Sequence, residues 1–287
     1  MDVKIGTYNV NNLFDRFDDP YSWGDDPSSR GTKPKKLDEI YQLGARLRED
    51  RPDVLALQEV EGKGVLYEFN VSQLGRFFKD IALIPANDIR RIDVAVASRL
   101  PLGQVVSYQF IRDPETGRKI FSRDLLEVEI LHPEQHGRRL FTLFVTHLKS
   151  KYVDPRQSAA EREKDRQQAD LLRWKQASTI AAIVRGRFPR PDAYFAIAGD
   201  FNDTPDSNLL APLLRDRQLQ LVDVLSFKPA AERWTHYWEK EQLHSQIDYL
   251  LLSPALARHL QVDSVHVVQE RFVGGSDHRP VYATLRF

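Results

Sequence analysis

A carboxylate and an amide stand two residues apart in the stretch Gly199-Asp200-Phe201-Asn202-Asp203. The apolar run at residues 194–198 predicts a buried strand that ends just before them. Because side chains alternate along a strand, Asp200 and Asn202 are expected to point in the same direction. Such a pair suits a site that binds water, a metal ion or a phosphate. A simple turn is the alternative, because Gly, Asp, Asn and Pro are also common turn residues.

Polar side chains follow several other predicted strands in the same way. They are Asn9, Asn11, Glu59, His147, Lys149, Asp277 and His278. Singly, each has an ordinary alternative, such as a surface acid or a core histidine. Together they are rich in Asp, Glu, Asn and His, and they lack a Ser or Cys nucleophile motif. This combination indicates a hard metal ion with oxygen ligands and water as the nucleophile.

Asp248 is a lone acid within the apolar stretch 246–252. An unpaired carboxylate is costly to bury, so a partner is expected nearby. A histidine is the natural candidate, because carboxylates commonly hold imidazoles in one tautomer.

The composition is that of an ordinary globular chain. Hydrophobic residues make up 41% of the 287 residues, which is ample for a sizeable core. Lys and Arg balance Asp and Glu at 41 each, so the net charge points to neither a nucleic acid nor a membrane. The absence of cysteine excludes disulfides, thiolate catalysis and cysteine-ligated zinc. No signal peptide or membrane span is visible, so we expect a cytoplasmic protein, although a secreted protein without its signal peptide would look the same.

Apolar periodicity predicts strands and helices without strict alternation. Helices are predicted at residues 36–50, 64–78, 159–187 and 209–214. Strands are predicted at 3–10, 54–57, 81–84, 92–97, 104–110, 119–130, 139–146, 194–198, 221–224, 234–238, 246–252, 260–268 and 281–287. An acidic loop fits no calcium-loop template; its acids are Asp15, Asp18, Asp19, Asp25 and Asp26. We expect residues 1–287 to form a single α+β domain of two packed sheets covered by helices.

Six short motifs span nearly the whole chain: Tyr8-Asn9-Val10-Asn11, Leu57-Gln58-Glu59-Val60, Thr146-His147-Leu148-Lys149, Gly199-Asp200-Phe201-Asn202, Ile247-Asp248-Tyr249 and Gly275-Ser276-Asp277-His278-Arg279-Pro280. Their identity and order resemble the endonuclease/exonuclease/phosphatase superfamily. The resemblance implies a DNase I-like, four-layer α/β-sandwich with the site at one edge. The superfamily holds nucleases, phosphatases, sphingomyelinases and deadenylases, so the resemblance says much less about the substrate.

The resemblance also implies a metal site and a base. Glu59 would be the principal ligand of Mg²⁺ (or Mn²⁺), with Asn11 and Asp277 helping directly or through water. Asp200 would orient or deprotonate the attacking water.

The remaining matching residues would act on the phosphate. Asn9 and Asn202 would hold phosphate oxygens and position the catalytic aspartate. His278, paired with Asp248, would stabilise the charge of the transition state or serve as acid or base. His147 would contact the scissile phosphate.

Two positions depart from the abasic-site endonucleases of this superfamily. Those enzymes carry an acid at the position of Asn11, and a tryptophan where this chain has His244-Ser245-Gln246. The histidine at His147 further favours the DNase I-like branch. The aromatic strand 234–238 could stack on bases, although aromatic strands more often belong to a core.

We therefore expect a divalent-metal-dependent phosphodiesterase, and foremost a monomeric nuclease acting on DNA or RNA. Candidate phosphate-binding cations are Lys149, Lys151, Arg91, Arg99 and Arg123, each with the alternative of a solvated surface charge. A phosphatase acting on a soluble or lipid phosphate ester is the alternative enzyme. A catalytically inactive binding module of the same fold is the non-enzymatic alternative, and the intact set of acids, amides and histidines argues against it.

Overall fold

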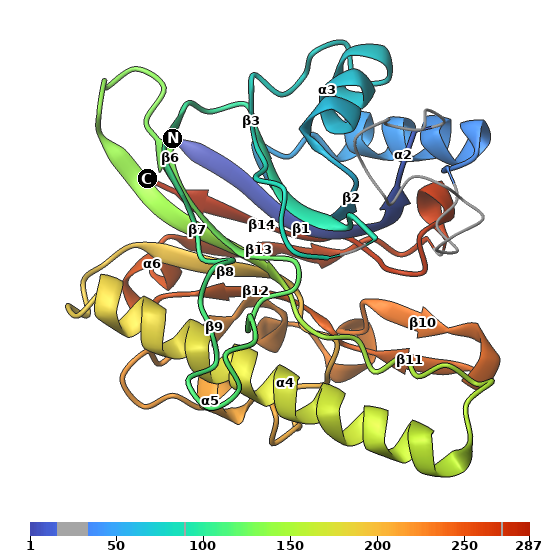
Figure 1. The fold of residues 1–287 in the computed structure, drawn as a ribbon. Helices are drawn as coiled ribbons and strands as arrows, with labels where there is room; N and C mark the ends of the chain where they lie inside the picture. Colours follow the sequence, from blue (N-terminus) through green and yellow to red (C-terminus); the bar gives the residue numbers. More distant parts are fainter. Residues whose placement is uncertain (16–33, 89, 271) are drawn as a thin grey trace.

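The computed structural model describes residues 1–15, 34–88, 90–270 and 272–287 (Figure 1). One six-stranded sheet has the order β13-β14-β1-β2-β4-β3; its strands are β1 (Asp2–Leu13), β2 (Val54–Val60), β3 (Asp80–Ala82), β4 (Asp93–Ser98), β13 (Leu260–Val267) and β14 (Val281–Arg286). The other has the order β5-β6-β7-β8-β12-β9; its strands are β5 (Leu102–Ser107), β6 (Leu125–Leu131), β7 (Arg139–His147), β8 (Phe195–Asp200), β9 (Val222–Asp223) and β12 (Asp248–Leu252). A separate hairpin pairs β10 (His236–Trp238) with β11 (Leu243–Ser245).

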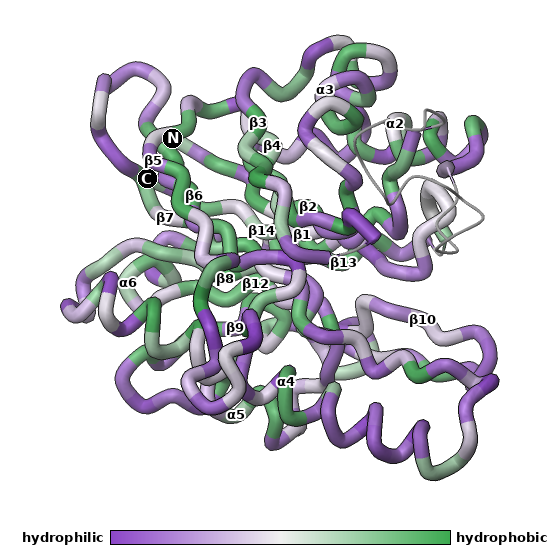
Figure 2. Tube along the Cα trace, in the orientation of Figure 1, coloured by the Kyte–Doolittle hydropathy of each residue, from purple (hydrophilic) through white to green (hydrophobic). Residues whose placement is uncertain are grey.

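Helices cover the outer face of each sheet. The helices α2 (Leu37–Asp50) and α3 (Lys63–Ser72) pack on the first sheet, and α4 (Ala159–Arg187) and α5 (Ala211–Leu214) pack on the second. A third apolar core lies between the sheets. The short elements are α6 (Pro254–Ala257) and the 3₁₀ helices Val224–Phe227, Ala230–Glu232, Glu239–Glu241 and Val273–Gly275. The result is the four-layer α/β-sandwich, with hydrophobic strands inside and hydrophilic loops outside (Figure 2).

Strand register brings the polar motifs to one edge of the sandwich. β1 runs parallel to β2 with Asn9 opposite Gln58, and β7 runs parallel to β8 with His147 opposite Asp200. β12 is antiparallel to β8 and begins with Asp248 opposite Asp200. β14 is antiparallel to β1 and begins just after residues 277–280. Four strand ends and two strand starts therefore meet at this edge, which we call the active edge.

The helix α4 is predicted with its observed bounds, whereas several other elements are shorter than expected, among them α3 and β6. The helix α3 ends at Ser72 because the chain turns at Gly75 and Arg76, where φ is positive, and the Asn70 amide holds the turn through both backbone groups of Phe78. The strand β6 starts at Leu125 because Asp124 has a φ of 126°, which interrupts an extended chain.

Other expected features fall outside these sheets or outside the described residues. The hairpin strand β11 is not predicted by the sequence pattern. In the acidic loop, Asp18, Asp19, Asp25 and Asp26 lie outside the described residues. No helix of the described chain combines the length and apolar character that crossing a bilayer requires.

The two termini lie side by side (Figure 1). The Met1 ammonium donates to the carbonyl oxygen of Phe287 at 2.6 Å, and the Phe287 N–H donates to the Met1 carbonyl at 2.9 Å. Asp2 pairs with Arg286 at the start of β1, so both termini lie at the sheet edge opposite the active edge.

Candidate active site

Asp200 is the buried centre of the active edge. The first sheet contributes Asn9, whose Nδ2 donates to Asp200 Oδ2 at 3.0 Å. The second sheet contributes His147, whose Nε2 lies 3.4 Å from the same oxygen. The backbone N–H of Asn202 donates to Asp200 Oδ1 at 2.8 Å. Burial raises the pKa of Asp200 more than the charge of His278 and these hydrogen bonds lower it, so Asp200 is a carboxylate poised to accept a proton.

Gly199 permits this arrangement. Its φ is 146°, and a Cβ at this position would lie 1.9 Å from the carbonyl oxygen of Thr146. A side chain would therefore separate β7 from β8 at the point where His147 and Asp200 face each other.

Asp248 has the histidine partner that the sequence predicts. His278 Nδ1 lies 2.9 Å from Asp248 Oδ2, and His278 Nε2 lies 3.7 Å from Asp200 Oδ2. Burial disfavours the charged ring, but the carboxylates of Asp248 and Asp200 outweigh it and raise the pKa of His278. His278 therefore carries a proton at neutral pH.

His147 is the opposite case. Burial, followed by the positive charges of Arg123 and His278, holds the pKa of His147 well below its ordinary value. Its Nδ1 is buried without a hydrogen-bond partner among the described residues. His147 is therefore a neutral imidazole whose Nε2 faces the site.

The three predicted metal ligands lie in one hydrogen-bonded neighbourhood, although Asn11 turns its amide nitrogen toward Asp277 while its amide oxygen accepts from Asn12. Asn11 Nδ2 donates to Asp277 Oδ1 at 3.2 Å, and the neighbouring backbone N–H of Asn12 donates to Glu59 Oε2 at 3.1 Å. The side chain of Asp277 is 40% exposed, so a cation keeps access to water. An oxygen-only donor set with room for water fits Mg²⁺, which dehydrates reluctantly.

Irregular backbone aims these side chains. Asn11, Glu59 and Asn202 all have positive φ, at 48°, 64° and 54°. β-Bulges interrupt the pairing of β1 with β2 after Asn9 and of β2 with β4 after Gln58. Asparagine adopts this conformation readily, whereas it is uncommon for a glutamate. In the sequence, the irregular backbone is indicated only by several Asn residues close together at the end of a strand.

The prediction that the side chains of Asp200 and Asn202 point in the same direction is wrong. Asn202 lies beyond the end of β8 in a left-handed conformation, so its side chain does not follow Asp200. Its Nδ2 donates instead to the carbonyl oxygen of Leu148 at 3.0 Å. Asn202 thus ties the end of β8 to the loop after β7.

Only one predicted phosphate-binding cation is both close to the site and unpaired. Within the described residues, the Lys149 ammonium makes no hydrogen bond or ion pair. The Lys151 ammonium lies 2.5 Å from Asp203 Oδ1, and Arg123 is buried against Asp88 at 2.8 Å.

Arg99, another predicted phosphate-binding cation, lies far from the active edge. It follows β4 at the end where Ser98 faces Val54, which is the far end of β2 from Glu59. Its guanidinium pairs with Asp53 at 2.6 Å, which explains the residue without a phosphate. Arg91 precedes β4 with a φ of 57°.

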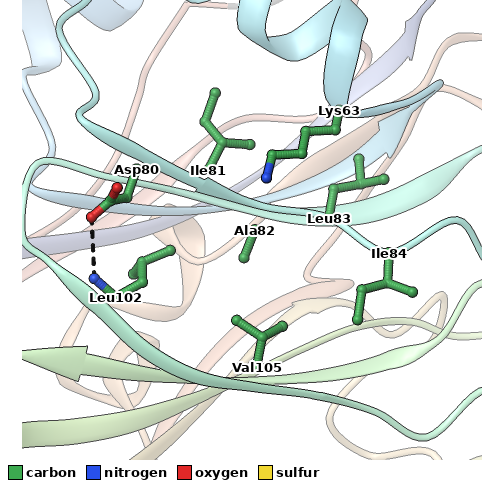
Figure 3. A pocket seen from close by; sticks show the side chains of 8 residues that line it. All are labelled: Lys63, Asp80, Ile81, Ala82, Leu83, Ile84, Leu102 and Val105. Atoms are coloured by element: carbon green, nitrogen blue, oxygen red, sulfur yellow. Dashed lines mark hydrogen bonds between the residues drawn. The ribbon is translucent and has the colours of Figure 1, made fainter.

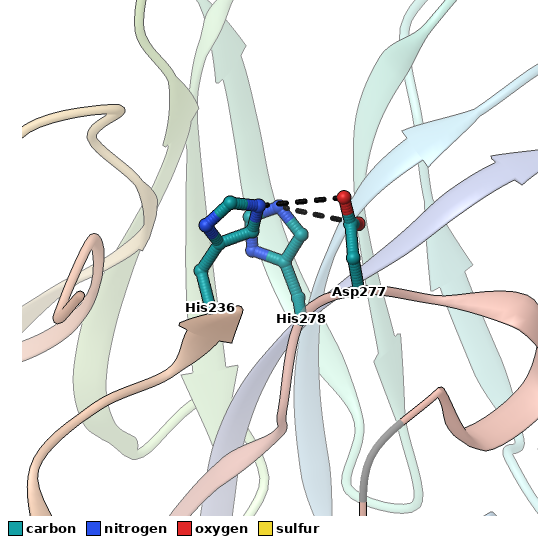
Figure 4. A group of neighbouring side chains, drawn as sticks. All are labelled: His236, Asp277 and His278. Atoms are coloured by element: carbon teal, nitrogen blue, oxygen red, sulfur yellow. Dashed lines mark hydrogen bonds and ion pairs between the residues drawn. The ribbon is translucent and has the colours of Figure 1, made fainter. Parts of the chain in front are cut away.

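Sequence reasoning assigned His236 only to an aromatic strand. The structure places its Nε2 3.3 Å from Asp277 Oδ2 and its ring 4.8 Å from that of His278 (Figure 4). On the same strand, Tyr237 is buried while Trp238 is 47% exposed. Trp234 packs on Arg279.

A separate pocket of about 300 Å³ lies between the edge strands β3 and β5 (Figure 3). Its lining residues are Lys63, Asp80, Ile81, Ala82, Leu83, Ile84, Leu102 and Val105. None of the predicted site residues belongs to it.

Comparison with known proteins agrees with this arrangement. The AP endonuclease from Archaeoglobus fulgidus has a TM-score of 0.65 at 17% identity, over 99% of this chain and 100% of that one. The 3′ phosphatase NExo from Neisseria, bound to a product DNA hairpin, has a TM-score of 0.62 at 20% identity, over 99% and 100%. The human Nocturnin catalytic domain has a TM-score of 0.62 at 17% identity, over 100% and 94%. At these identities the likeness shows the DNase I-like fold alone.

No curated protein matches the chain in a sequence comparison. The model of the Endonuclease/Exonuclease/phosphatase family, however, matches residues 6–278, which include five of the six motifs in full and the sixth as far as His278. The chain therefore belongs to the endonuclease/exonuclease/phosphatase family of phosphoric ester hydrolases.

Proposed function

We propose that this chain is a Mg²⁺- or Mn²⁺-dependent phosphodiesterase, and specifically a monomeric, single-domain nuclease that hydrolyses DNA or RNA. One observation carries the proposal: the buried carboxylate of Asp200 lies between the neutral His147 and the protonated His278, next to a set of oxygen donors. Phosphoryl transfer needs little more than an oriented water and groups that stabilise charge on the phosphate oxygens.

Asp200 would accept a proton from the attacking water, because its burial makes it more basic than an ordinary aspartate. The Asn9 amide and the Asn202 N–H hold the carboxylate in place. His147 would donate from Nε2 to a phosphate oxygen, and Lys149 would add a nearby positive charge.

His278 would hold a proton at Nε2 and direct it at a phosphate oxygen or at the leaving oxygen. The Asp248 carboxylate fixes the ring through Nδ1 and keeps it charged. Glu59, Asn11 and Asp277 would bind the divalent cation, which neutralises phosphate charge when bound.

The test is a metal-dependent activity screen on DNA, RNA and phosphomonoesters. Activity should vanish in EDTA and return with Mg²⁺ or Mn²⁺. Glu59→Gln should keep the fold and abolish activity, because the neutral amide loses the charge that holds a hard cation. Full activity in EDTA would overturn the mechanism.

A phosphatase that acts on a small phosphate ester is the second candidate. The observation that favours it is the scarcity of unpaired cations, since Lys151 and Arg123 already have carboxylate partners. Hydrolysis of a phosphomonoester without any cleavage of DNA or RNA in the same screen would establish it.

A further inference from the structure

We propose that His236, Asp277 and His278 form a second divalent-cation site, selective for a borderline cation such as Zn²⁺ (Figure 4). The donor atoms are two imidazole nitrogens and one carboxylate oxygen, and all lie within 4.8 Å of one another. This site shares Asp277 with the oxygen-only set of Glu59, Asn11 and Asp277, but it adds two imidazole nitrogens. Imidazole suits Zn²⁺, whereas carboxylate and amide oxygens suit Mg²⁺.

The distances fit a tetrahedral ion. Bonds of about 2.0–2.1 Å to a tetrahedral Zn²⁺ place the ligand atoms roughly 3.4 Å apart. His236 Nε2 lies 3.3 Å from Asp277 Oδ2, and His278 Nε2 lies 3.9 Å from Asp277 Oδ1. These two distances end on different oxygens of Asp277, and the donor atoms of the three residues lie within 4.8 Å of one another, so the side chains would have to rotate to close around the ion.

The backbone keeps the three ligands together. His236 and His278 face each other in an antiparallel bridge, and the Tyr237 N–H donates to the Asp277 carbonyl oxygen at 3.2 Å. Main-chain pairing already fixes the backbone of these residues, so binding a cation requires little further ordering of the backbone.

Zn²⁺ would displace the proton that His278 carries at Nε2 in the metal-free protein, so the cation and the proton would compete for this nitrogen. His278 also has the outer partner that metal-binding histidines commonly have. Asp248 Oδ2 lies 2.9 Å from Nδ1, which leaves Nε2 directed toward Asp277 and His236. A carboxylate on the far nitrogen fixes the ring and makes the free nitrogen a better ligand. The exposed side of Asp277 leaves a route for the ion and a position for water.

The experiment is a titration of the full chain with Zn²⁺ by calorimetry, in millimolar Mg²⁺ so that the oxygen set is occupied. His236→Phe keeps a ring against His278 but removes one ligand, and it should weaken Zn²⁺ binding more than tenfold. His244→Phe is the matched control, because His244 is an exposed histidine on the neighbouring β11 that lies outside the cluster. It should bind Zn²⁺ as the unmodified chain does.

Co²⁺ supplies a second readout that requires no catalysis. Co²⁺ bound through imidazole nitrogens in a four-coordinate site absorbs visible light far more strongly than aqueous Co²⁺. The unmodified chain and His244→Phe should show this absorption, and His236→Phe should lose it. If His236→Phe does not fold, His236→Gln tests the same ligand. If the His236 variants bind Zn²⁺ as tightly as the unmodified chain does, or if the unmodified chain binds no Zn²⁺, the proposal is overturned, whatever the substrate of the enzyme.

Discussion

Asp200, Asp248 and His278 form one buried chain of charges in which each group depends on the next. The carboxylate of Asp248 is buried because it meets His278, and His278 stays charged because it lies between two carboxylates. A group buried in this way loses its function when its partner is removed.

This dependence predicts strong non-additivity. Asp248→Asn and His278→Ala should each lower kcat by about 10²-fold or more, which is typical of lost acid–base residues. The double variant should fall within about threefold of His278→Ala, because the aspartate acts only through the histidine. Losses that add in log kcat would show two independent roles.

Asp93 gives a pH-dependent prediction outside the set of catalytic candidates. Burial raises the pKa of Asp93 from 3.8 to about 7, although the Ala86 N–H donates to its carboxylate. As the pH rises, the unfolded chain therefore loses this proton at a lower pH than the folded chain, so the free energy of unfolding should fall as the pH approaches 7 and then level off. Asp93→Asn has no such proton, so it should not show this decrease in stability.

Relative to the unmodified chain, Asp93→Asn should gain on the order of 1–2 kcal/mol in free energy of unfolding between pH 5 and pH 8. Urea unfolding at several pH values measures this difference. Asp263→Asn, at an exposed position of β13, is the control and should leave the pH profile unchanged. A constant difference for Asp93→Asn at every pH would contradict the prediction.

The residue types of the site could be predicted from the sequence, but not all of their directions. The cost of burying an acid predicted a histidine partner for Asp248, and the family resemblance identified that partner as His278. The side chain of Asn202 could not be placed, because its left-handed conformation beyond the strand end is invisible to a rule of alternation. His236 was missed because its contact with Asp277 depends on a bridge between distant segments.

At the scale of elements, the close approach of β7 and β8 positions His147 opposite Asp200. Gly199→Ala should disrupt this approach, because the new Cβ meets the Thr146 carbonyl oxygen and the positive φ adds strain. We expect a loss of about 3 kcal/mol or more in denaturant unfolding, together with loss of activity.

Gly186 provides the matched control. It lies in α4, and beyond the backbone of its own helix no atom lies within 4 Å of the position that a Cβ would take. Gly186→Ala should therefore raise stability by up to about 1 kcal/mol, the usual difference between the two residues in a helix. If the two glycine variants show the same change in stability and activity, Gly199 is not required for the close approach of β7 and β8.

Elements with strong periodicity could be predicted, and those set by tertiary contacts could not. The bounds of α4 follow from its capping box at Ser158 and Glu161 and its apolar second half. The early end of α3 depends on the Asn70 side chain, which holds the chain from a distance of 8 residues. Sequence patterns do not reveal such a contact.

At the scale of the whole molecule, a neutral protein must bind its substrate through a local charge. Cleavage of a DNA strand should slow markedly between low and physiological salt, because bound phosphates release counterions. Since Lys149 has no carboxylate partner among the described residues, Lys149→Ala should reduce the slope of log affinity against log salt by about one. Lys151→Ala should change it less, because Asp203 already neutralises that charge.

Lys79→Ala is the control, since Lys79 is exposed next to β3 at the far end of the first sheet. Hydrolysis of a nitrophenyl phosphodiester should hardly respond to Lys149→Ala. Equal rate losses on the small ester and on DNA would place this lysine at the scissile phosphate instead.

The pairing of the two termini has a practical consequence. Because β1 begins and β14 ends side by side, a short peptide linker can join the two ends without crossing either sheet. New termini opened in the exposed loop at residues 133–137, between β6 and β7, should then give a circularly permuted enzyme with the same fold. The original ends also offer a place to attach the protein to a solid support with its active edge facing the solution.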